Sequence, residues 1–432
     1  MKKVNVGLVG FGTVGKGVVK TLISKKHVFE KKSGVSINLV RIVDKDIRPR
    51  PGVSVPKSIL TKNIDKVIKD RSIDIVVELI GGIHPAKEII LKALTSGKHV
   101  VTANKALLAE HGKEIFAVAS RFRACLGFEA SVGGGIPVIN ALMRGLVANN
   151  IESIYGILNG TSNFILTKMA LDGYSFAEAL KDAQEKGIAE KNPKLDISGG
   201  DSSHKLAILA LLGFGLYAKE KDIYVEGIER IEAIDMQYAK ECGYALKLLG
   251  IAKRKGKELD IRVHPTLISE NNILASVKYE DNAIFIKGDM VGENLFYGKG
   301  AGSMPTASAV VSDIIRIARN VDDFKKTKDS FDFEFGSGVN KAQKVNNLVS
   351  RYYLRFAAID KPGVLAKVSK VLAENNISIA TVSQKERKEG QPVPLVIITH
   401  HANEGRMNKA LKKINEMPFI TKKAVKIRIE KL

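Results

Sequence analysis

One irregular stretch, EKNPKLDISGGDSSHK at residues 190–205, contains three acids and ends in a lysine. Asp196 follows Glu190 by six residues, Asp201 follows Asp196 by five, and Lys205 follows Asp201 by four. A proline and a pair of glycines interrupt any regular helix or strand there. Carboxylates and a lysine ammonium can hold a charged substrate and transfer a proton. The stretch is a candidate active-site loop; a solvated loop that caps the next helix is the alternative, with Asp201 as the N-cap of a helix over 202–214.

A second lysine lies where a parallel sheet would present it to a ligand. Lys105 comes just after the apolar run at 99–102, and another apolar run at 73–82 precedes it in the chain. Residues beyond the carboxyl ends of parallel strands face the ligand crevice. We expect Lys105 to meet a cofactor or substrate; a surface lysine near a helix start is the alternative.

The start of the chain, VNVGLVGFGTVGKGVVKTLIS, has the pattern of a nucleotide-binding turn. An apolar run precedes a GxGxxG spacing, and apolar residues with helical spacing follow. One glycine makes the tight turn, one lets the backbone approach a pyrophosphate, and one lets the helix pack on the strand. The phosphates would lie at the helix N-terminus, where amide groups favour anions. The residues of this turn are Gly10, Phe11, Gly12, Thr13, Val14 and Gly15.

The segment after the second expected strand bears on which dinucleotide binds. That strand ends at Asp44, and Lys45, Asp46, Arg48 and Arg50 follow. An acid at this point holds the ribose 2′-hydroxyl of NAD, whereas nearby cations suit the 2′-phosphate of NADP. We favour NADP, with NAD as the alternative, and a charged surface loop is the structural alternative for each side chain.

Two further segments place glycines and polar residues where a ligand could be held. Glu129 precedes a glycine triplet at 133–135, and such a turn can offer carbonyl oxygens to a hard cation or form a hinge. Gly160 and Thr161 follow an expected strand and begin a helix, a second ligand-facing strand end.

The last eighty residues have their own pattern of elements. A linker-like segment, KKTKDSFDFEFGSGVNKAQKVNN, is followed by an expected strand at 352–359, a DKPG turn, a helix and a strand at 377–382. PLVIITHHA, MNKALKKIN and KAVKIRIEKL continue as strand, helix and strand. The order β-α-β-β-α-β is that of a ferredoxin-like domain.

Composition excludes several classes of protein. The net charge of +22 comes from 68 basic and 46 acidic residues spread along the chain, without stacking aromatics between the basic residues, so we expect no nucleic-acid partner. The two cysteines, Cys125 and Cys242, lie far apart, which argues against disulfides and a zinc site. No apolar run reaches the roughly 20 residues of a membrane span. We expect a cytoplasmic protein with no membrane partner.

Six motifs, in order, resemble the homoserine dehydrogenase family. They are the GxGxxG start, TANK, EASVGGGIP, LNGTSN, GIAEKNPKLDISGGDSSHKLAIL and YGKGAGSMPTASAVVSD. The resemblance implies an oxidoreductase that interconverts L-aspartate 4-semialdehyde and L-homoserine with NAD(P), on the route to threonine, methionine and isoleucine. Asn192, where an Asp is common, and Ile188, where an aromatic is common, depart from the family pattern; Ile188 leaves one substrate contact open.

The resemblance also assigns roles to residues. Lys205 would donate and accept the proton, Asp201 and Asp196 would hold the substrate or orient Lys205, and Glu190 would pair with the substrate ammonium. Gly160 and Thr161 would line the substrate pocket. A monovalent cation, Na⁺ or K⁺, would be held by Glu129, Val132, Gly134 and Ile136. Beyond the glycine-rich turn, the cofactor contacts would be Lys45, Gly81, Lys105 and Gly302.

The DKPGVL turn and the Asn-Asn-Ile that follows the next helix resemble an ACT domain, a module that binds amino acids. The resemblance implies either a threonine effector or a dimerisation module without a ligand. The candidate effector contacts are Asp360, Gly363, Val364 and Asn376.

The expected architecture is α/β with three domains. A doubly wound Rossmann-type domain covers 1–135 and is completed by a return segment at 300–322. An α+β catalytic and dimerisation domain covers 136–299, a linker 323–350, and a ferredoxin-like ACT domain 351–432. We expect a homodimer or a higher homo-oligomer.

Three other functions fit parts of the sequence. The Rossmann domain alone would serve an oxidoreductase of another small aldehyde or 2-amino acid, but the charged stretch at 190–205 argues against it. An amino-acid-responsive regulator could bind nucleic acid through the +22 charge. A non-catalytic NADPH sensor would not need both Lys105 and Lys205.

Overall fold

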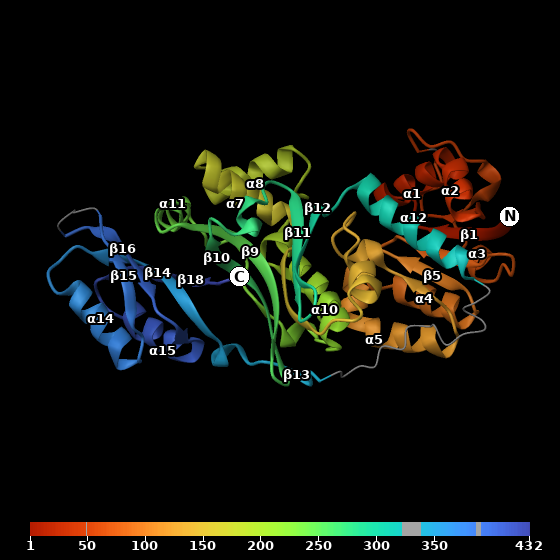
Figure 1. The fold of residues 1–432 in the computed structure, drawn as a ribbon. Helices are drawn as coiled ribbons and strands as arrows, with labels where there is room; N and C mark the ends of the chain where they lie inside the picture. Colours follow the sequence, from red (N-terminus) through yellow and green to blue (C-terminus); the bar gives the residue numbers. More distant parts are fainter. Residues whose placement is uncertain (49, 322–337, 386–389) are drawn as a thin grey trace. The chain divides into compact units, whose positions relative to one another are not determined.

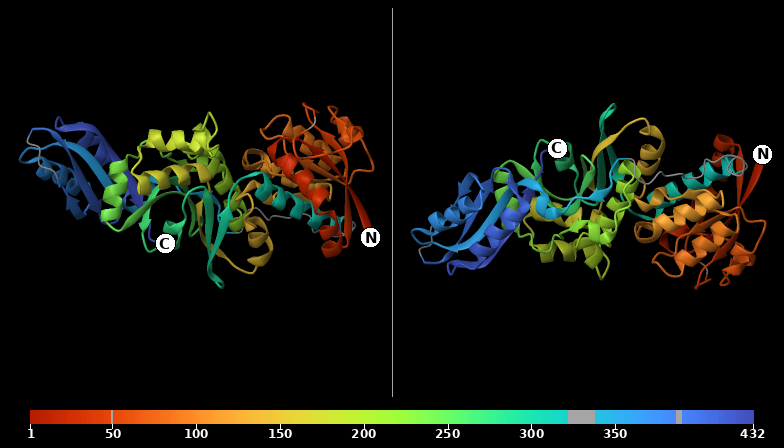
Figure 2. Two further views of the ribbon diagram at one scale, coloured as in Figure 1. Left: turned by 90° about the horizontal axis from the view of Figure 1, so that it is seen from above. Right: turned by 90° about the horizontal axis from the view of Figure 1, so that it is seen from below.

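The computed structural model describes the chain apart from residues 49, 322–337 and 386–389. The chain forms two compact units. Unit 1 comprises Met1–Ile154, His204–Glu220 and Asn282–Val339. Unit 2 comprises Tyr155–Ser203, Lys221–Asp281 and Asn340–Leu432. Figure 1 labels the helices and strands, and Figure 2 gives two further views.

Unit 1 is built on a six-stranded parallel sheet in the order β3-β2-β1-β4-β5-β6. The strands are β1 (Lys2–Val9), β2 (Val35–Val43), β3 (Leu60–Thr61), β4 (Ile75–Glu78), β5 (His99–Thr102) and β6 (Leu126–Gly127). All of β4 and β5 is buried, as expected for parallel strands covered on both faces. This order is that of the doubly wound dinucleotide-binding fold, which confirms the predicted fold class.

Helices cover both faces of this sheet. They are α1 (Thr13–Ser24), α2 (Lys26–Ser33), α3 (Asp65–Ile68), α4 (Ala86–Thr95), α5 (Lys105–Arg121) and α12 (Ser303–Arg319). Figure 1 shows α4 and α5 on the face opposite α1 and α12. The return helix α12 packs directly on α1. The two helices are so close at Gly17 that a Cβ there would lie 2.6 Å from the carbonyl oxygen of Ser303. The Ser303 hydroxyl also donates to the Thr13 carbonyl at 2.8 Å.

The glycine triplet leads into a short helix. The 3-10 turn η2 (Glu129–Ser131) precedes α6 (Val138–Asn140), which passes into a π-helical turn, η3 (Ala141–Gly145). Strands β7 (Ile151–Ile157), β11 (Asp281–Gly288) and β12 (Gly292–Lys299) follow along the chain.

Unit 2 contains helices and the central strands of a larger sheet. The helices are α7 (Gly160–Asp172), α8 (Phe176–Glu185), α9 (Lys194–Ile197) and α11 (Ala233–Glu241). Within the sheet β9 (Tyr244–Lys255) pairs antiparallel with β10 (Glu258–Ser269), and β8 (Tyr224–Val225) and β13 (Lys341–Ala342) also pair with β10. Short 3-10 turns lie at η1 (Lys57–Ile59), η4 (Glu220–Asp222), η5 (Ile273–Ser276) and η6 (Val345–Asn347).

Helix α10 (Gly200–Phe214) starts two residues earlier than expected. The expected N-cap, Asp201, therefore lies inside the first helical turn, where its negative charge faces the positive end of the helix dipole. The N-cap assignment for Asp201 was wrong.

The C-terminal part of unit 2 has the predicted β-α-β-β-α-β order. Its elements are β14 (Val349–Ile359), α14 (Val364–Glu374), β15 (Ile379–Ser383), β16 (Pro392–Thr399), α15 (Glu404–Asn415) and β18 (Ile420–Ile429), with β17 (Ala402–Asn403) paired to β14. The strand order is β18-β14-β16-β15, and both helices pack on one face of these strands (Figures 1 and 2).

This domain is not separated from the rest of unit 2. Strand β18 pairs in parallel with β10, placing Arg428 opposite Thr266, so one sheet runs from β9 and β10 into the ferredoxin-like strands. Pairing of this kind satisfies two edge strands at once. Of the expected linker, residues 323–337 lie outside the described residues, and 341–342 form β13.

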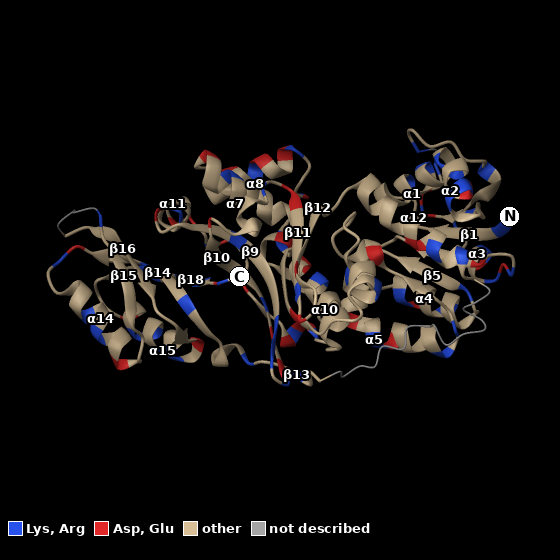
Figure 3. Ribbon diagram, viewed as in Figure 1, with Lys and Arg blue, Asp and Glu red and all other residues tan. Residues whose placement is uncertain are grey.

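Charged residues are distributed over the helices and strands of both units (Figure 3). Lysine and arginine residues alternate with acids on many elements, and the excess of positive charge is spread along the whole chain.

Candidate active site

The glycine-rich turn has the geometry of a phosphate cradle. Gly10 has a φ of +102°, and a Cβ there would lie 2.7 Å from the backbone of Leu79. A Cβ at Gly15 would lie 2.1 Å from the carbonyl oxygen of Gly10, so the helix and the strand can pack this closely only without a side chain. No atom lies within 4 Å of a Cβ built at Gly12, the N-cap of α1. The backbone at Gly12 is therefore open to an anion.

Asp44 at the end of β2 is bound to the same turn. Its Oδ2 accepts the amide of Phe11 at 2.5 Å, and its Oδ1 accepts the amide of Asp46 at 2.8 Å. The Arg50 guanidinium lies 3.5 Å from Oδ1 of Asp44 and donates to Oδ2 of Asp46 at 3.1 Å. Hydrogen bonds from Arg48 lower the pKa of Asp46 well below its usual range. Both a carboxylate and a guanidinium therefore lie at the carboxyl end of β2, as a ribose or a 2′-phosphate would require.

Glu78, at the end of β4, is a residue that the sequence analysis did not select. Its carboxylate is fully buried and accepts the Ile80 amide at 2.8 Å, the Gly81 amide at 3.3 Å and the Thr102 hydroxyl at 2.7 Å. Burial raises the pKa of Glu78 despite these hydrogen bonds. The signal was available, because an acid that ends a fully apolar strand must be paired to be buried. Glu78 thus fixes the loop that carries Gly81.

Lys105 is the first residue of α5, as its position after a strand predicted. The preceding Asn104 caps the helix, accepting the Leu107 amide at 3.2 Å, and donates to the Gly82 carbonyl at 2.6 Å. Lys105 is half-buried at this point, at the carboxyl end of β5. Gly302 lies in the same unit as the N-cap of α12, with a φ of +115°.

The turn of Glu129 is tightly held and buried. Its carboxylate accepts the Ile139 amide at 2.9 Å and the Asn140 amide at 2.9 Å, and its own amide donates to Asp313 at 2.8 Å. Burial, with the nearby charge of Asp313, raises the pKa of Glu129. Asp313, on α12, was not selected from the sequence although it ends one of the quoted motifs.

Backbone carbonyl groups in and around the glycine triplet could serve as cation ligands. The carbonyl groups of Val132 and Gly134 belong to buried residues, and no hydrogen bond of the described part of the chain ends on either oxygen. The carbonyl of Ile136 accepts the Val138 amide at 2.9 Å. Two buried carbonyl oxygens without donors beside a buried carboxylate fit a hard cation. No group of three or more His, Cys, Asp or Glu that could hold a metal occurs among the described residues.

The side-chain amide of Asn159 links two acids of the 190–205 stretch, Asp196 and Asp201. Its Nδ2 donates to Oδ1 of Asp196 and to Oδ2 of Asp201, both at 2.8 Å, while its Oδ1 accepts the Ser162 amide at 2.7 Å as the N-cap of α7. Two acids five residues apart are thereby brought to one amide group. The sequence analysis quoted Asn159 within a motif but did not select it as a site residue. Lys205 lies one turn along α10 from Asp201 and is 7% exposed.

Three other residues were expected at the substrate site: Thr161 and Gly160 are closely packed, whereas Glu190 is exposed. The Thr161 hydroxyl donates to the Ile188 carbonyl at 3.1 Å, which ties α7 to the segment before Glu190. A Cβ at Gly160 would lie 2.6 Å from the Glu280 carbonyl oxygen, so only glycine fits there. Glu190 itself is exposed, and the two hydrogen bonds from the Asn159 amide go to Asp196 and Asp201.

The four candidate effector contacts lie at both ends of one helix. Asp360 and Gly363 form the turn before α14, and Val364 begins the helix. Asn376, with a φ of +56°, follows its last turn. Because eleven helical residues span about 16 Å, one copy of the domain does not bring all four together.

Comparison with known proteins assigns the three parts of the chain to three family models. Family models match residues 10–129 (homoserine dehydrogenase, NAD binding domain), 137–315 (homoserine dehydrogenase) and 352–419 (ACT domain). No described helix is both long and apolar enough to span a membrane.

Individual relatives cover the whole length. A homoserine dehydrogenase of Neisseria gonorrhoeae is 42% identical over 100% of both chains. The crystal structure of a homoserine dehydrogenase from Thiobacillus denitrificans is 42% identical, with a TM-score of 0.92 over 100% of this chain and 99% of that one. A hyperthermophilic archaeal homoserine dehydrogenase in complex with NADPH is 28% identical, with a TM-score of 0.61 over 73% of this chain and 97% of that one. The chain belongs to the homoserine dehydrogenase family of NAD(P)-dependent oxidoreductases, and it carries the ACT domain at its C-terminal end.

Proposed function

We propose that the chain interconverts L-aspartate 4-semialdehyde and L-homoserine, with Lys205 as the residue that gives up and takes back the proton on the substrate oxygen. The observation that carries this proposal is the pair of hydrogen bonds from Asn159, which join Asp196 to Asp201. Asp201 lies one helical turn before the buried Lys205 on α10. A bound nicotinamide supplies or accepts the hydride at the substrate carbon. The protein then needs only to place the substrate and move one proton.

Within this proposal the acids orient and Lys205 reacts. Asp201 on α10 favours the charged form of a nearby ammonium, which keeps Lys205 ready to donate in the direction of aldehyde reduction. Glu190 pairs with the ammonium group of the substrate, Asp196 holds the substrate or orients Lys205, and Gly160 and Thr161 line the substrate pocket. Glu190 is exposed in the structure, so its role requires the substrate to come to the loop surface. Lys105 acts as the second lysine, toward the cofactor and the reacting oxygen.

For the cofactor we propose NADP, with NAD as the alternative. The pyrophosphate would be held at Gly10–Gly15, and the 2′-phosphate by Arg50 and Lys45 beyond β2. The solved archaeal relative in complex with NADPH supports this choice. Changing Arg50 to Gln should raise the KM for NADP about tenfold and leave the KM for NAD unchanged, because only the phosphate needs the guanidinium.

We also propose a monovalent cation, Na⁺ or K⁺, at Glu129 and the carbonyl groups of Val132, Gly134 and Ile136. The carbonyl groups of Val132 and Gly134, which accept no hydrogen bond from the described residues, and the buried carboxylate of Glu129 support a cation there. Replacing both ions by tetramethylammonium should lower the Tm and the activity together, and Glu129→Gln should abolish that dependence.

For the ACT domain we propose that a small amino acid binds where two copies of the domain pair. Threonine is the proposed ligand. The separation of Asn376 from Gly363 by the length of α14 supports a site shared between two copies. This implies a homodimer or a larger homo-oligomer in solution.

The test is to follow reduced-nicotinamide absorbance with homoserine and NADP, then NAD, each with and without threonine. Homoserine-dependent reduction of the cofactor is expected, faster with NADP, and slowed by threonine. An absence of turnover with both cofactors, in both directions and in Na⁺ and K⁺, would exclude the proposed reaction. Turnover that threonine leaves unchanged would exclude only the effector proposal.

A further inference from the structure

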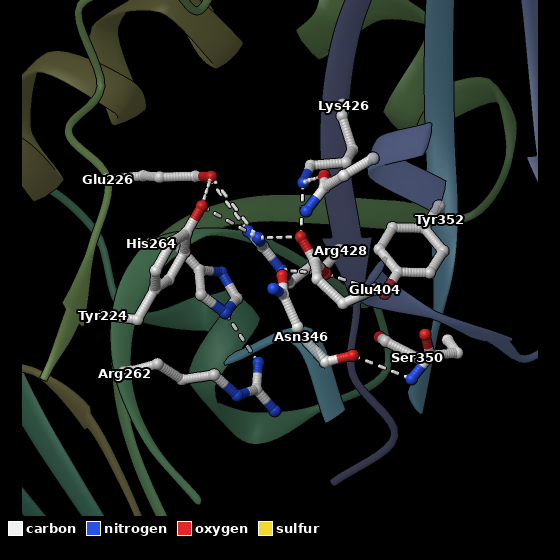
Figure 4. Close-up of polar contacts among 12 residues, drawn as sticks. Tyr224, Glu226, Arg262, His264, Asn346, Ser350, Tyr352, Glu404, Lys426 and Arg428 are labelled. Atoms are coloured by element: carbon white, nitrogen blue, oxygen red, sulfur yellow. Dashed lines mark hydrogen bonds and ion pairs between the residues drawn. The ribbon is translucent and has the colours of Figure 1, made fainter. Parts of the chain in front are cut away.

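A buried cluster of charges in unit 2 surrounds Arg428 of strand β18. Arg428 is fully buried, and its guanidinium donates to Glu404 at 2.6 and 3.0 Å. Both of those residues belong to the ACT domain. The same guanidinium reaches outside that domain, donating to Glu226 at 2.9 Å and to the Tyr224 hydroxyl at 3.1 Å (Figure 4). A buried guanidinium shared by two carboxylates fixes both partners in position.

The partners outside the ACT domain belong to a short segment with defined register. Tyr224 lies in β8, opposite Arg262 of β10, and the Glu226 amide donates to the Val263 carbonyl at 2.8 Å. Arg428 itself lies over the ring of Tyr224, 4.8 Å from its centre. The segment 224–226 is therefore held between strand β10 on one side and the Arg428 side chain on the other.

The neighbouring residues of this segment carry the loop of the substrate site. The Ile228 amide donates to the Ile197 carbonyl at 2.8 Å, directly after Asp196. A Cβ at Gly227 would lie 2.4 Å from the same carbonyl oxygen, and a Cβ at Gly199 would lie 3.0 Å from Val225. The backbone at 197–199 thus rests on residues 225–228 at contact distance.

We propose that Arg428 of the ACT domain is a positioning residue for the reaction: by holding Glu226 it fixes the segment on which the Asp196 loop rests. The ACT domain then shapes the substrate site in the absence of any effector. The inference rests on the proposed function only in that the loop around Asp196 binds the substrate. A regulator bound to this domain would reach the loop through β18 and β8, since both pair with β10.

A second ion pair between the ACT domain and the rest of unit 2 provides a matched control. Arg355 of β14 donates to Asp235 on α11 at 2.7 and 2.9 Å, and both side chains are buried. Arg355 therefore docks the same domain to a different element. If Arg428 only docked the ACT domain on the rest of unit 2, replacing Arg355 would have the same effect on the reaction as replacing Arg428.

The experiment compares Arg428→Met, Glu226→Ala and their combination with Arg355→Met in the full chain. The first two should raise the KM for homoserine about tenfold and leave the Kd for NADPH unchanged. The double variant should be no worse than either single one, because both remove the same contact. Arg355→Met should lower the Tm with an unchanged KM. Glu226, which is part-exposed, keeps the test possible if Arg428→Met fails to fold.

Hydrogen exchange gives a readout that does not depend on turnover. Amides of residues 190–203 should exchange faster in Glu226→Ala and at the wild-type rate in Arg355→Met. An unchanged KM and unchanged exchange in Glu226→Ala, or an equal rise of KM in Arg355→Met, would overturn the proposal. If the wild-type chain does not oxidise homoserine, the proposed function fails, and the exchange result still decides whether Arg428 positions the loop.

Discussion

Asn159 donates from its side-chain amide to the carboxylate of Asp201 at 2.8 Å, although 42 residues separate them in the chain. This bond links the N-cap of α7 to the first turn of α10, and the same amide group holds Asp196. Asp196 and Asp201 are therefore ordered before any substrate arrives. Preorganised groups of this kind lower a barrier because they need no rearrangement during the reaction.

Removing this amide should damage the reaction and not the binding of the cofactor. Asn159→Ala deletes both hydrogen bonds and the cap, and we expect kcat/KM for homoserine to fall roughly 10²-fold. The Kd for NADPH, measured by fluorescence titration, should stay unchanged. Asn272→Ala removes an equivalent cap, whose side chain accepts the Leu274 amide at 2.9 Å, and should retain full activity. Equal losses in both variants would contradict a special role for Asn159.

Lys205 should be needed for proton transfer and not for charge alone. Lys205→Ala should lose most of its kcat, about 10²-fold or more, while NADPH still binds. Lys205→Arg preserves the positive charge but holds its proton too strongly to transfer it, so it should be nearly as slow. A fully active alanine variant would remove Lys205 from the mechanism.

Two glycines of the same turn should respond differently to the same substitution. A Cβ at Gly12 meets no atom within 4 Å and the backbone there is ordinary, with a φ of −76°, so Gly12→Ala should keep the wild-type Tm and weaken NADPH binding. A Cβ at Gly15 would lie 2.1 Å from the Gly10 carbonyl oxygen, so Gly15→Ala should lower the Tm as well. Thermal unfolding with and without NADPH separates the two effects. A lowered Tm for apo Gly12→Ala would show that this glycine serves the fold.

The acid stability of unit 2 should depend on Glu404. Burial alone would raise the pKa of Glu404, but Arg428 and Lys426 hold it at about 2, against an ordinary value of 4.5. Because the folded-state pKa is lowered, the stabilisation is present above pH 4.5 and is lost as the pH falls toward 2. Glu404→Gln should therefore be less stable than wild type by about 3 kcal/mol at neutral pH, with a difference that shrinks in acid.

Urea unfolding of both chains between pH 2 and 7 measures this difference. Glu374→Gln makes the same change at an exposed site of the same domain, 4.0 Å from Lys413, and should leave the pH profile unchanged. A constant difference between wild type and Glu404→Gln at all pH values would contradict the lowered pKa.

The opposite dependence is expected for Lys247, a buried lysine of β9. Its ammonium donates to the carbonyl of Val277 and, at 3.3 Å, to the side chain of Asn163. Burial, with the nearby charge of Lys278, lowers its pKa to about 8 from an ordinary 10.5. A lysine with a lowered pKa costs stability below pH 8, and that cost disappears as the pH rises to 10.5.

Relative to Lys247→Met, the wild type should thus gain up to roughly 3 kcal/mol between pH 8 and 10.5. Urea midpoints of the two chains across that range give the difference. Lys240→Met, at an exposed position, should show no such trend. A flat difference for Lys247→Met would mean that the buried lysine keeps its ordinary pKa.

The predicted fold class was correct because its signals are local. The alternation of apolar strands, glycine turns and helices in the first 130 residues permits few sheet orders, and right-handed crossovers select the observed one. The same holds for the β-α-β-β-α-β order of the last eighty residues. The cap at Asp201 was misplaced because α10 begins at Gly200, a boundary that tertiary packing set.

Two acids that support the site, Glu78 and Asp313, could not be identified as important from the sequence. Glu78 and Asp313 stabilise loops that carry expected site residues, but each is an isolated acid within an apolar pattern. Their importance comes from burial, and burial depends on which segments pack together. Asn376, which the sequence did suggest, is separated from Gly363 by the length of α14 in a single copy of the chain, and Glu190 is exposed.

The sequence by itself determined the residue types and the order of elements: a glycine turn for phosphates, acids and lysines at strand and helix ends, and a C-terminal ferredoxin-like domain. Only the tertiary structure decided that β18 continues the sheet of β10 and that one buried guanidinium, Arg428, joins the ACT domain to the segment beneath the substrate loop. Periodicity and turn residues act over a few positions, so they can be read from the chain. Strand pairing and burial of an ion pair depend on residues about 200 positions apart, and only the folded chain brings those together.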